Sequence, residues 1–146
     1  MRIENRKAKF QYEIIETVEA GIALQGAEVK SLSEGRASLK ESFARIREGQ
    51  AFLHGFYIAP YQAVFEKPDP VRKRTLLLHR REIGRLARKV EEKGLTLIPV
   101  SVYFNKRGLA KVQLALARGK TRRDKRQTLK RREVEREIER SVKQRR

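Results

Sequence analysis

The segment from residue 118 to residue 146 constrains the fold most, because it holds almost nothing that a hydrophobic core could use. Its sequence from Gly119, GKTRRDKRQTLKRREVEREIERSVKQRR, has no aromatic residue and no proline. Nearly all Phe, Tyr and runs of Leu, Ile and Val fall before Ala117, so any core must form there. We therefore expect an RNA-binding globular domain over residues 1–117 and a basic C-terminal tail over residues 118–146.

Basic residues are in excess in both of these parts. The chain has a formal net charge of +18, and residues 118–146 contribute +9 of it, from 14 Lys and Arg against 5 Asp and Glu. The remaining +9 belongs to the expected globular domain. A cationic excess in both parts is typical of proteins that neutralise phosphates, so we expect a nucleic acid as partner.

Several other classes of function are not favoured by the sequence. The absence of cysteine excludes disulfides, thiolate catalysis and Cys-based zinc sites. His54 and His79 fall on different predicted elements with no carboxylate at ligand spacing, and ARGKT at 117–121 lacks the glycine that a phosphate loop needs at Leu114. No apolar run approaches the ~20 residues of a membrane span. We expect a cytoplasmic, non-enzymatic protein without cofactor, metal or membrane partner.

Alternating apolar and polar residues predict antiparallel strands. KFQYEII, which starts at Lys9, alternates in this way, TVEAG predicts a turn, and GIALQG predicts a returning strand. SFARIREGQAFLHGFYI predicts a β-hairpin, and LTLIPVSVYF and AKVQLALA predict two strands joined by NKRG. Pro99 within the first of these two predicts an edge position or a bulge.

Two segments have helical spacing. GAEVKSLSEG predicts a short helix, and HRREIGRLARKVEEKG places its apolar residues at helical intervals before Gly94, a suitable C-terminal cap. PYQAVFEKPDPVRKR predicts an irregular connection. About six antiparallel strands in so small a domain would leave exposed edges unless they closed on themselves. We expect a mainly β fold, a closed antiparallel oligonucleotide-binding-like barrel with two to three helices.

The N-terminal stretch NRKAKFQY interleaves basic and aromatic residues. In such a stretch the polar and basic side chains can contact phosphates, and the rings can stack on unpaired bases. The residues concerned are Asn5, Arg6, Lys7, Lys9, Phe10 and Tyr12. The alternative is that the rings belong to the core and the charges to a solvated flank.

Glu19 is unusual on a surface that binds phosphate. Its carboxylate could accept a hydrogen bond from a base amino group, or it could orient Arg6 or Lys30. His79 is placed either to open its helix or to face RNA.

The tail, if helical, has two parallel rows of side chains. Val134, Ile138 and Val142 form one row, and Arg132, Arg136 and Arg140 form the other. The apolar row is too thin to join a core, and like charges four residues apart are unfavourable in an isolated helix. One alternative is a frayed or salt-bridged helix. We favour a segment that is disordered when free and becomes helical against phosphates.

Several of these motifs occur together and in order: NRKAKFQYEI, EAGIALQGAEVKSL, LLLH, GLTLIPVSVYF and, in the tail, GK, DKR and KRRE. In this respect the chain, from about Glu4 to Arg140, resembles the SmpB (small protein B) family of bacterial tmRNA-binding proteins. The resemblance implies an oligonucleotide-binding-like barrel with a basic tail. It also implies that the protein binds the tRNA-like domain of tmRNA. With elongation factor Tu and GTP, it would deliver tmRNA to ribosomes stalled without a stop codon. The tail would occupy the decoding centre and the empty mRNA channel.

The resemblance also assigns residues. It implies that Asn5, Tyr12, Glu19 and Leu77 contact tmRNA and that the DKR motif begins the functional part of the tail. With the basic residues above, the candidate tmRNA-binding set is Asn5, Arg6, Lys7, Tyr12, Glu19, Lys30, Leu77 and His79. The candidate ribosome-binding set is Lys120, Asp124, Lys125, Arg126, Lys130, Arg132, Arg136 and Arg140. Thr75 and Val134 depart from the family pattern, and Phe10 stands where some members have His. The alternative is a structural ribosomal protein with a basic extension.

Overall fold

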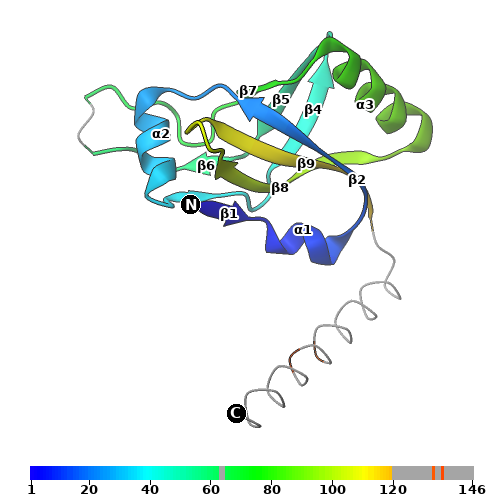
Figure 1. The fold of residues 1–146 in the computed structure, drawn as a ribbon, viewed down its shortest axis with the longest axis horizontal. Coiled ribbons are helices and arrows are strands. Elements are labelled where there is room, and N and C mark those ends of the chain that lie inside the picture. Colours follow the sequence, from blue (N-terminus) through cyan, green and yellow to red (C-terminus); the bar gives the residue numbers. More distant parts are fainter. Residues whose placement is uncertain (63–64, 120–132, 134–135, 137–146) are drawn as a thin grey trace.

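The structure is a computed structural model that describes residues 1–62, 65–119, 133 and 136 (Figure 1). Its helices are α1 (Arg6–Gln11), α2 (Gly26–Ser33) and α3 (Arg80–Lys93). Its strands are β1 (Arg2–Glu4), β2 (Tyr12–Ile22), β3 (Ala37–Ser38), β4 (Phe43–Arg47), β5 (Gln50–His54), β6 (Tyr57–Ile58), β7 (Arg74–Leu77), β8 (Thr96–Phe104) and β9 (Ala110–Gly119). The described part is thus mainly β with three helices, as the sequence predicts.

Seven of the strands form one antiparallel sheet in the order β1-β8-β4-β5-β7-β2-β9. β8 also pairs with β9, so the hydrogen-bonded ladders lead from β8 through β4, β5, β7, β2 and β9 back to β8. The short strands β3 and β6 pair separately. Figure 1 shows α2 and α3 at opposite ends of the sheet, with α1 connecting β1 to β2.

The apolar residues of the strands divide between two clusters because side chains alternate along a strand. In β9, Val112, Leu114 and Leu116 join the main cluster, which also holds Phe56 and Leu86. Ala115 and Ala117 point to a second cluster with Ala8, Ile98 and Val100. Both faces of β9 are therefore covered in this region, the second by α1.

The N-terminal region differs from the prediction. The expected strand from Lys9 is wrong over its first residues, which belong to α1, and β2 starts only at Tyr12. Asn5 explains the helix, because its Oδ1 accepts a hydrogen bond from the N–H of Ala8 at 3.2 Å and so caps the first turn. A helix this short is stabilised by its cap and by the burial of Ala8. It has no repeating apolar pattern that would predict it from the sequence.

The predicted turn at TVEAG is also wrong, since β2 continues through it to Ile22. Pairing with β9 extends from Tyr12 opposite Gly119 to Gly21 opposite Lys111, with one irregularity between Ile14 and Glu16. Gly21 is buried within the sheet, so it serves close packing and not a reversal of the chain.

Other predicted elements are confirmed. α2, the β4–β5 hairpin, α3 and the β8–β9 pair lie where the sequence places them. Gly94 ends α3 in the left-handed conformation with φ 61°, and the β8–β9 register shifts between Pro99 and Ser101, as the proline predicts. Three short strands were not predicted from the sequence: β1, β3 and β7.

Most of the predicted tail lies outside the described residues, including Lys120, Asp124, Lys125, Arg126, Lys130, Arg132 and Arg140. Glu133 and Arg136 are described, and both are helical and exposed. Within the described residues, no helix combines the length and the apolar character needed to cross a membrane.

Candidate nucleic-acid interface

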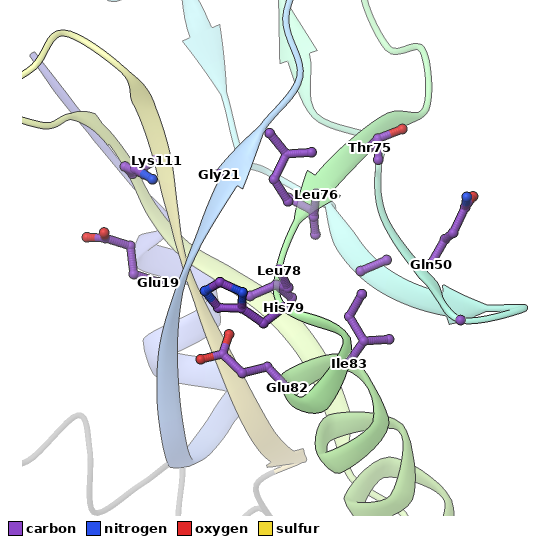
Figure 2. Close-up of a pocket in the computed structure, with 13 residues that line it drawn as sticks. Glu19, Gly21, Gln50, Thr75, Leu76, Leu78, His79, Glu82, Ile83 and Lys111 are labelled. Carbon is purple, nitrogen blue, oxygen red and sulfur yellow. The ribbon is translucent and has the colours of Figure 1, made fainter.

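A depression that contains predicted RNA-binding residues lies between β2, β7 and the start of α3, and we call it the main groove. It has a volume of about 570 Å³ (Figure 2). Three predicted residues line it: Glu19 from β2, Leu77 from β7, and His79 at the start of α3. Lys111 of β9 and Gln50 of β5 lie at its margins. The structure thus brings together residues that are up to 60 positions apart in the sequence (79 − 19).

Leu77 is exposed because of the alternation along β7. Arg74 and Leu76 point into the protein, while Thr75 and Leu77 point outward, and Leu77 is 58% exposed. Gly21 lies opposite Leu77 on β2, and a Cβ atom at Gly21 would lie 3.1 Å from the Leu77 Cβ. The glycine therefore allows Leu77 to lie flat against β2, where its side chain offers an apolar surface to a ligand.

Glu19 has a partner that the sequence did not indicate. Its carboxylate accepts a hydrogen bond from the hydroxyl of Tyr103 on β8, which is not one of the predicted partners Arg6 and Lys30. Burial and this bond raise the pKa of Tyr103, so its hydroxyl keeps the proton that it donates. The Tyr103 ring in turn lies 4.9 Å from the Arg2 guanidinium. Glu19 is thus oriented by a neutral donor and keeps acceptor sites for a ligand.

His79 begins α3 and is exposed. Its backbone accepts a hydrogen bond from the N–H of Ile83 at 3.1 Å, while its side chain makes no capping hydrogen bond. The imidazole points toward β2 in Figure 2, with the Glu82 carboxylate beside it. Both predicted roles are therefore compatible: the backbone opens the helix and the ring faces the main groove.

Asn5 is not in the main groove, and most of its side chain is buried. It is 7% exposed, its Nδ2 donates to the Pro99 carbonyl at 2.9 Å, and its Oδ1 caps α1. Arg6 and Lys7, the next two residues, are exposed on α1. We therefore assign Asn5 a positioning role: it holds α1 on β8 so that the two cations project into solvent.

The remaining predicted residues lie elsewhere. Lys7 and Tyr12 line a second depression of about 290 Å³, which Phe43 also lines. Tyr12 is seven residues from Glu19 on β2, a separation of about 23 Å at ~3.3 Å per residue. Lys30 is on α2, with its ammonium 5.4 Å from the Tyr61 ring. The candidate set therefore occupies three separate places.

Sequence reasoning missed the residues that hold α3 against β2. Glu16 accepts hydrogen bonds from Arg85 and, at 2.7 Å, from Lys89. The hydrogen bonds from Lys89 and Arg85 keep the pKa of the Glu16 carboxyl below its ordinary value. The spacing of Arg85 and Lys89, four residues apart on one helical face, is the signal that could have indicated a shared acceptor. This contact sets where α3 begins relative to β2, and so where His79 lies.

A second missed group is the buried network around Glu28 on α2. The side chain of Arg74 is fully buried, and its Nε donates to the Glu28 carboxylate at 2.7 Å. Arg72 donates to the same carboxylate at 2.5 Å. The prediction for PYQAVFEKPDPVRKR, which includes Arg72 and Arg74, was an irregular connection. The alternation of Arg74 with the buried Leu76 was the available signal that Arg74 points inward.

The described residues hold no group of three or more His, Cys, Asp or Glu that could bind a metal ion. The main groove instead offers an apolar side chain, an imidazole, an oriented carboxylate and a nearby lysine. These groups suit the recognition of unpaired bases by stacking and by hydrogen bonds to their edges.

Comparisons with known proteins show which proteins this chain is similar to. The family model described as SmpB protein matches residues 2–144. A protein of Chlorobaculum tepidum named SsrA-binding protein is 53% identical over 143 residues, covering 97% of this chain and 91% of that protein. An SsrA-binding protein of Thermus thermophilus is 54% identical over 138 residues, covering 94% of this chain and 96% of that protein.

A solved structure also matches the chain. It is described as "tmRNA-SmpB: a journey to the center of the bacterial ribosome", and its matching chain is 53% identical with a TM-score of 0.70. The match covers 88% of this chain and 94% of the other. The family model and the relatives extend over both the sheet and the basic C-terminal segment, and this chain belongs to the SmpB protein family.

Proposed function

We propose that this chain binds the tRNA-like domain of tmRNA and acts in trans-translation, the rescue of ribosomes stalled on messages that lack a stop codon. The observation that carries the proposal is the identity of 53% with a protein named SsrA-binding protein over 97% of the chain. The net charge of +18 supports a polyanionic partner. The proposal gives the chain a binding role and no reaction to catalyse.

In this proposal the main groove recognises unpaired nucleotides of tmRNA. Leu77 provides apolar contact, the His79 ring stacks on a base or donates to it, and Glu19 accepts from a base amino group. Lys111 lies beside them and would neutralise a phosphate. Arg6 and Lys7 provide phosphate contacts at α1, and Tyr12 and Lys30 mark the outer limits of the same interface.

The proposal divides the chain into an RNA-binding domain, residues 1–117, and a tail, residues 118–146. The ring of strand pairings supports a closed oligonucleotide-binding-like barrel for the domain. The tail would fold into a helix when it enters the decoding centre and the empty mRNA channel of the ribosome. Elongation factor Tu with GTP would join through the tmRNA complex.

Removal of the residues after Gly119 tests this division. We expect the truncated protein to keep its affinity for tmRNA and to lose peptide tagging on stalled ribosomes, because the two parts have different partners. A loss of tmRNA affinity greater than tenfold, about 1.4 kcal/mol, would contradict the division.

The RNA that co-purifies with the chain tests the function itself. We expect tmRNA to be enriched and the protein to be substoichiometric on washed small subunits. Stoichiometric recovery with small subunits, without tmRNA, would instead identify a structural ribosomal protein.

A further inference from the structure

We propose that the outer face of the β4–β5 hairpin is a second RNA-binding surface, on which an unpaired base stacks beside bound phosphates. This inference rests on the proposed RNA-binding function and extends it to residues outside the candidate set. We call this surface the hairpin platform, and it consists of Phe43, Arg45, Arg47, Phe52, His54 and Lys73.

The pairing of β4 with β5 places these side chains on one face. Phe43 lies opposite His54 and Arg45 lies opposite Phe52, while Ala44 and Ala51, at the intervening positions, are buried. The aromatic and basic side chains therefore share the outer face, because alternate residues of a strand point the same way. Phe43 is 38% exposed, so part of its ring is accessible to a ligand.

The rings on the platform are already arranged as stacking surfaces. The Phe43 and His54 rings lie 5.1 Å apart at an interplanar angle of 9°. The Lys73 ammonium lies 4.4 Å from the centre of the Phe52 ring, and the Arg45 guanidinium lies 5.5 Å from the centre of the Phe43 ring. Both cations are on long, exposed side chains, so an incoming base can take their place on the rings while they move to its phosphates.

The charge of the platform favours RNA over a protein partner. Among the ion pairs of the described residues, none involves Arg45, Arg47 or Lys73. Burial is the main cause that lowers the pKa of His54, and the nearby positive charges of Arg45 and Lys73 lower it further. Cations that are not neutralised within the protein, next to stackable rings, complement a single-stranded polyanion.

The hairpin platform is also continuous with the main groove. Phe52 pairs with Thr75 of β7, and Thr75 and Gln50 both line the main groove. RNA bound at Leu77 on β7 would therefore need to reach only the neighbouring strand, β5, to contact Phe52. Because the platform continues the groove that is proposed to bind tmRNA, we assign the RNA on the platform to tmRNA.

Substitution of the platform rings tests the inference. Phe43→Leu and Phe52→Leu retain apolar volume but lose the ring, and Phe52→Tyr restores it. Phe65→Leu is the matched control, because Phe65 is fully exposed and lies outside the platform. Each full-length variant is assayed for dissociation constants with the tmRNA tRNA-like domain and with ribosomes stalled in the presence of tmRNA, and for its urea midpoint.

We expect Phe52→Leu to weaken the complex with the tRNA-like domain of tmRNA by about five- to tenfold, with recovery in Phe52→Tyr and no effect of Phe65→Leu. Loss only with ribosomes, at unchanged affinity for the tRNA-like domain, would overturn the assignment of the platform to tmRNA. Arg45→Gln should weaken the same complex and make its affinity less salt-dependent.

Unchanged affinity for both RNAs in the two Leu variants would overturn the inference. So would a loss of affinity in Phe52→Leu that is accompanied by a lower urea midpoint and is not restored in Phe52→Tyr. Loss of binding only to a protein component, such as the elongation factor, would overturn it as well. None of these outcomes affects the proposed function, which fails only if the wild-type chain itself does not bind tmRNA.

Discussion

The Arg74 guanidinium lies against the Glu28 carboxylate, with Nη2 2.5 Å from Oε2 and both side chains at most 1% exposed. Arg74 begins β7, which also carries Leu77, and Glu28 belongs to α2. Arg74 further donates to the backbone carbonyls of Phe56 and, at 3.1 Å, Pro70. A single buried cation therefore ties α2, the segment before β7 and β7 itself together, and it fixes the strand that lines the main groove.

Replacement of Glu28 should be strongly destabilising. Glu28→Gln removes the countercharge but leaves Arg74 buried, and breaking a buried pair in this way costs ~3–5 kcal/mol. Urea denaturation should show this loss, while Glu92→Gln on the exposed side of α3 should change the free energy of unfolding by less than about 0.5 kcal/mol. Equal stability of the two variants would show that Arg74 has adequate partners without Glu28.

The same carboxylate gives the fold an acid sensitivity. Burial alone would raise the pKa of Glu28, but the hydrogen bonds from Arg72, from the Gln25 N–H and from Arg74 outweigh it, so the pKa lies below the ordinary 4.5. A carboxyl whose pKa is depressed on folding stabilises the protein above its unfolded pKa. That stabilisation is lost as the pH falls below about 4.5 toward the folded value.

The urea midpoint at pH 7 and at pH 3 measures this effect. We expect wild-type protein to lose more stability between the two values than Glu28→Gln does. Parallel losses in the two proteins would mean that other carboxyl groups, such as Glu16, carry the acid sensitivity.

Asn5 provides a test of positioning against direct contact. Asn5→Ala removes both the cap of α1 and the donor to the Pro99 carbonyl, with an expected cost of about 2–3 kcal/mol. Asn5→Ser keeps a cap but is too short to reach Pro99, so it should cost about half as much. Affinity for tmRNA should fall in step with stability across the two variants. Weaker binding at unchanged stability would instead indicate that Asn5 contacts the RNA.

The elements that could be predicted from the sequence are those with local causes. The β4–β5 hairpin follows from alternation and its turn, and α3 follows from apolar spacing and Gly94. By contrast, α1 depends on the bond from Asn5 to Pro99, which is 94 residues away. β7 becomes a strand only because β2 and β5 provide partners on both sides. Such non-local causes leave no periodic signal in a short segment.

The candidate site shows the same division. Resemblance to a family identified Glu19 and Leu77, but their common groove depends on the register that sets Gly21 opposite Leu77. Alternation with Leu76 was a local signal for the burial of Arg74, but its partner Glu28, 46 residues earlier, could not be identified from the sequence. The platform rings were recognised only as strand residues, because their stacking depends on cross-strand pairing.

The bond between Tyr103 and Glu19 should matter for RNA binding. If Tyr103 holds the carboxylate in place for a base, Tyr103→Phe should weaken binding severalfold in the same direction as Glu19→Ala, although Glu19→Ala removes a negative charge. Affinity for the tRNA-like domain measures both effects. Tighter binding by Glu19→Ala would show that Glu19 only repels phosphate, and the role assigned to Tyr103 would then fail with it.

Gly21 should control the main groove through the space that it leaves for Leu77. In Gly21→Ala the new methyl group would lie 3.1 Å from the Leu77 Cβ, so Leu77 or β2 must move. Crowding of this kind costs ~1–3 kcal/mol in a packed site, and we expect weaker tmRNA binding together with a lower free energy of unfolding. Gly26→Ala is the matched control, since a Cβ there meets nothing within 4 Å. If Gly21→Ala binds tmRNA as tightly as Gly26→Ala does, the position of Leu77 against β2 is not what the RNA recognises, and the apolar contact assigned to Leu77 must be abandoned.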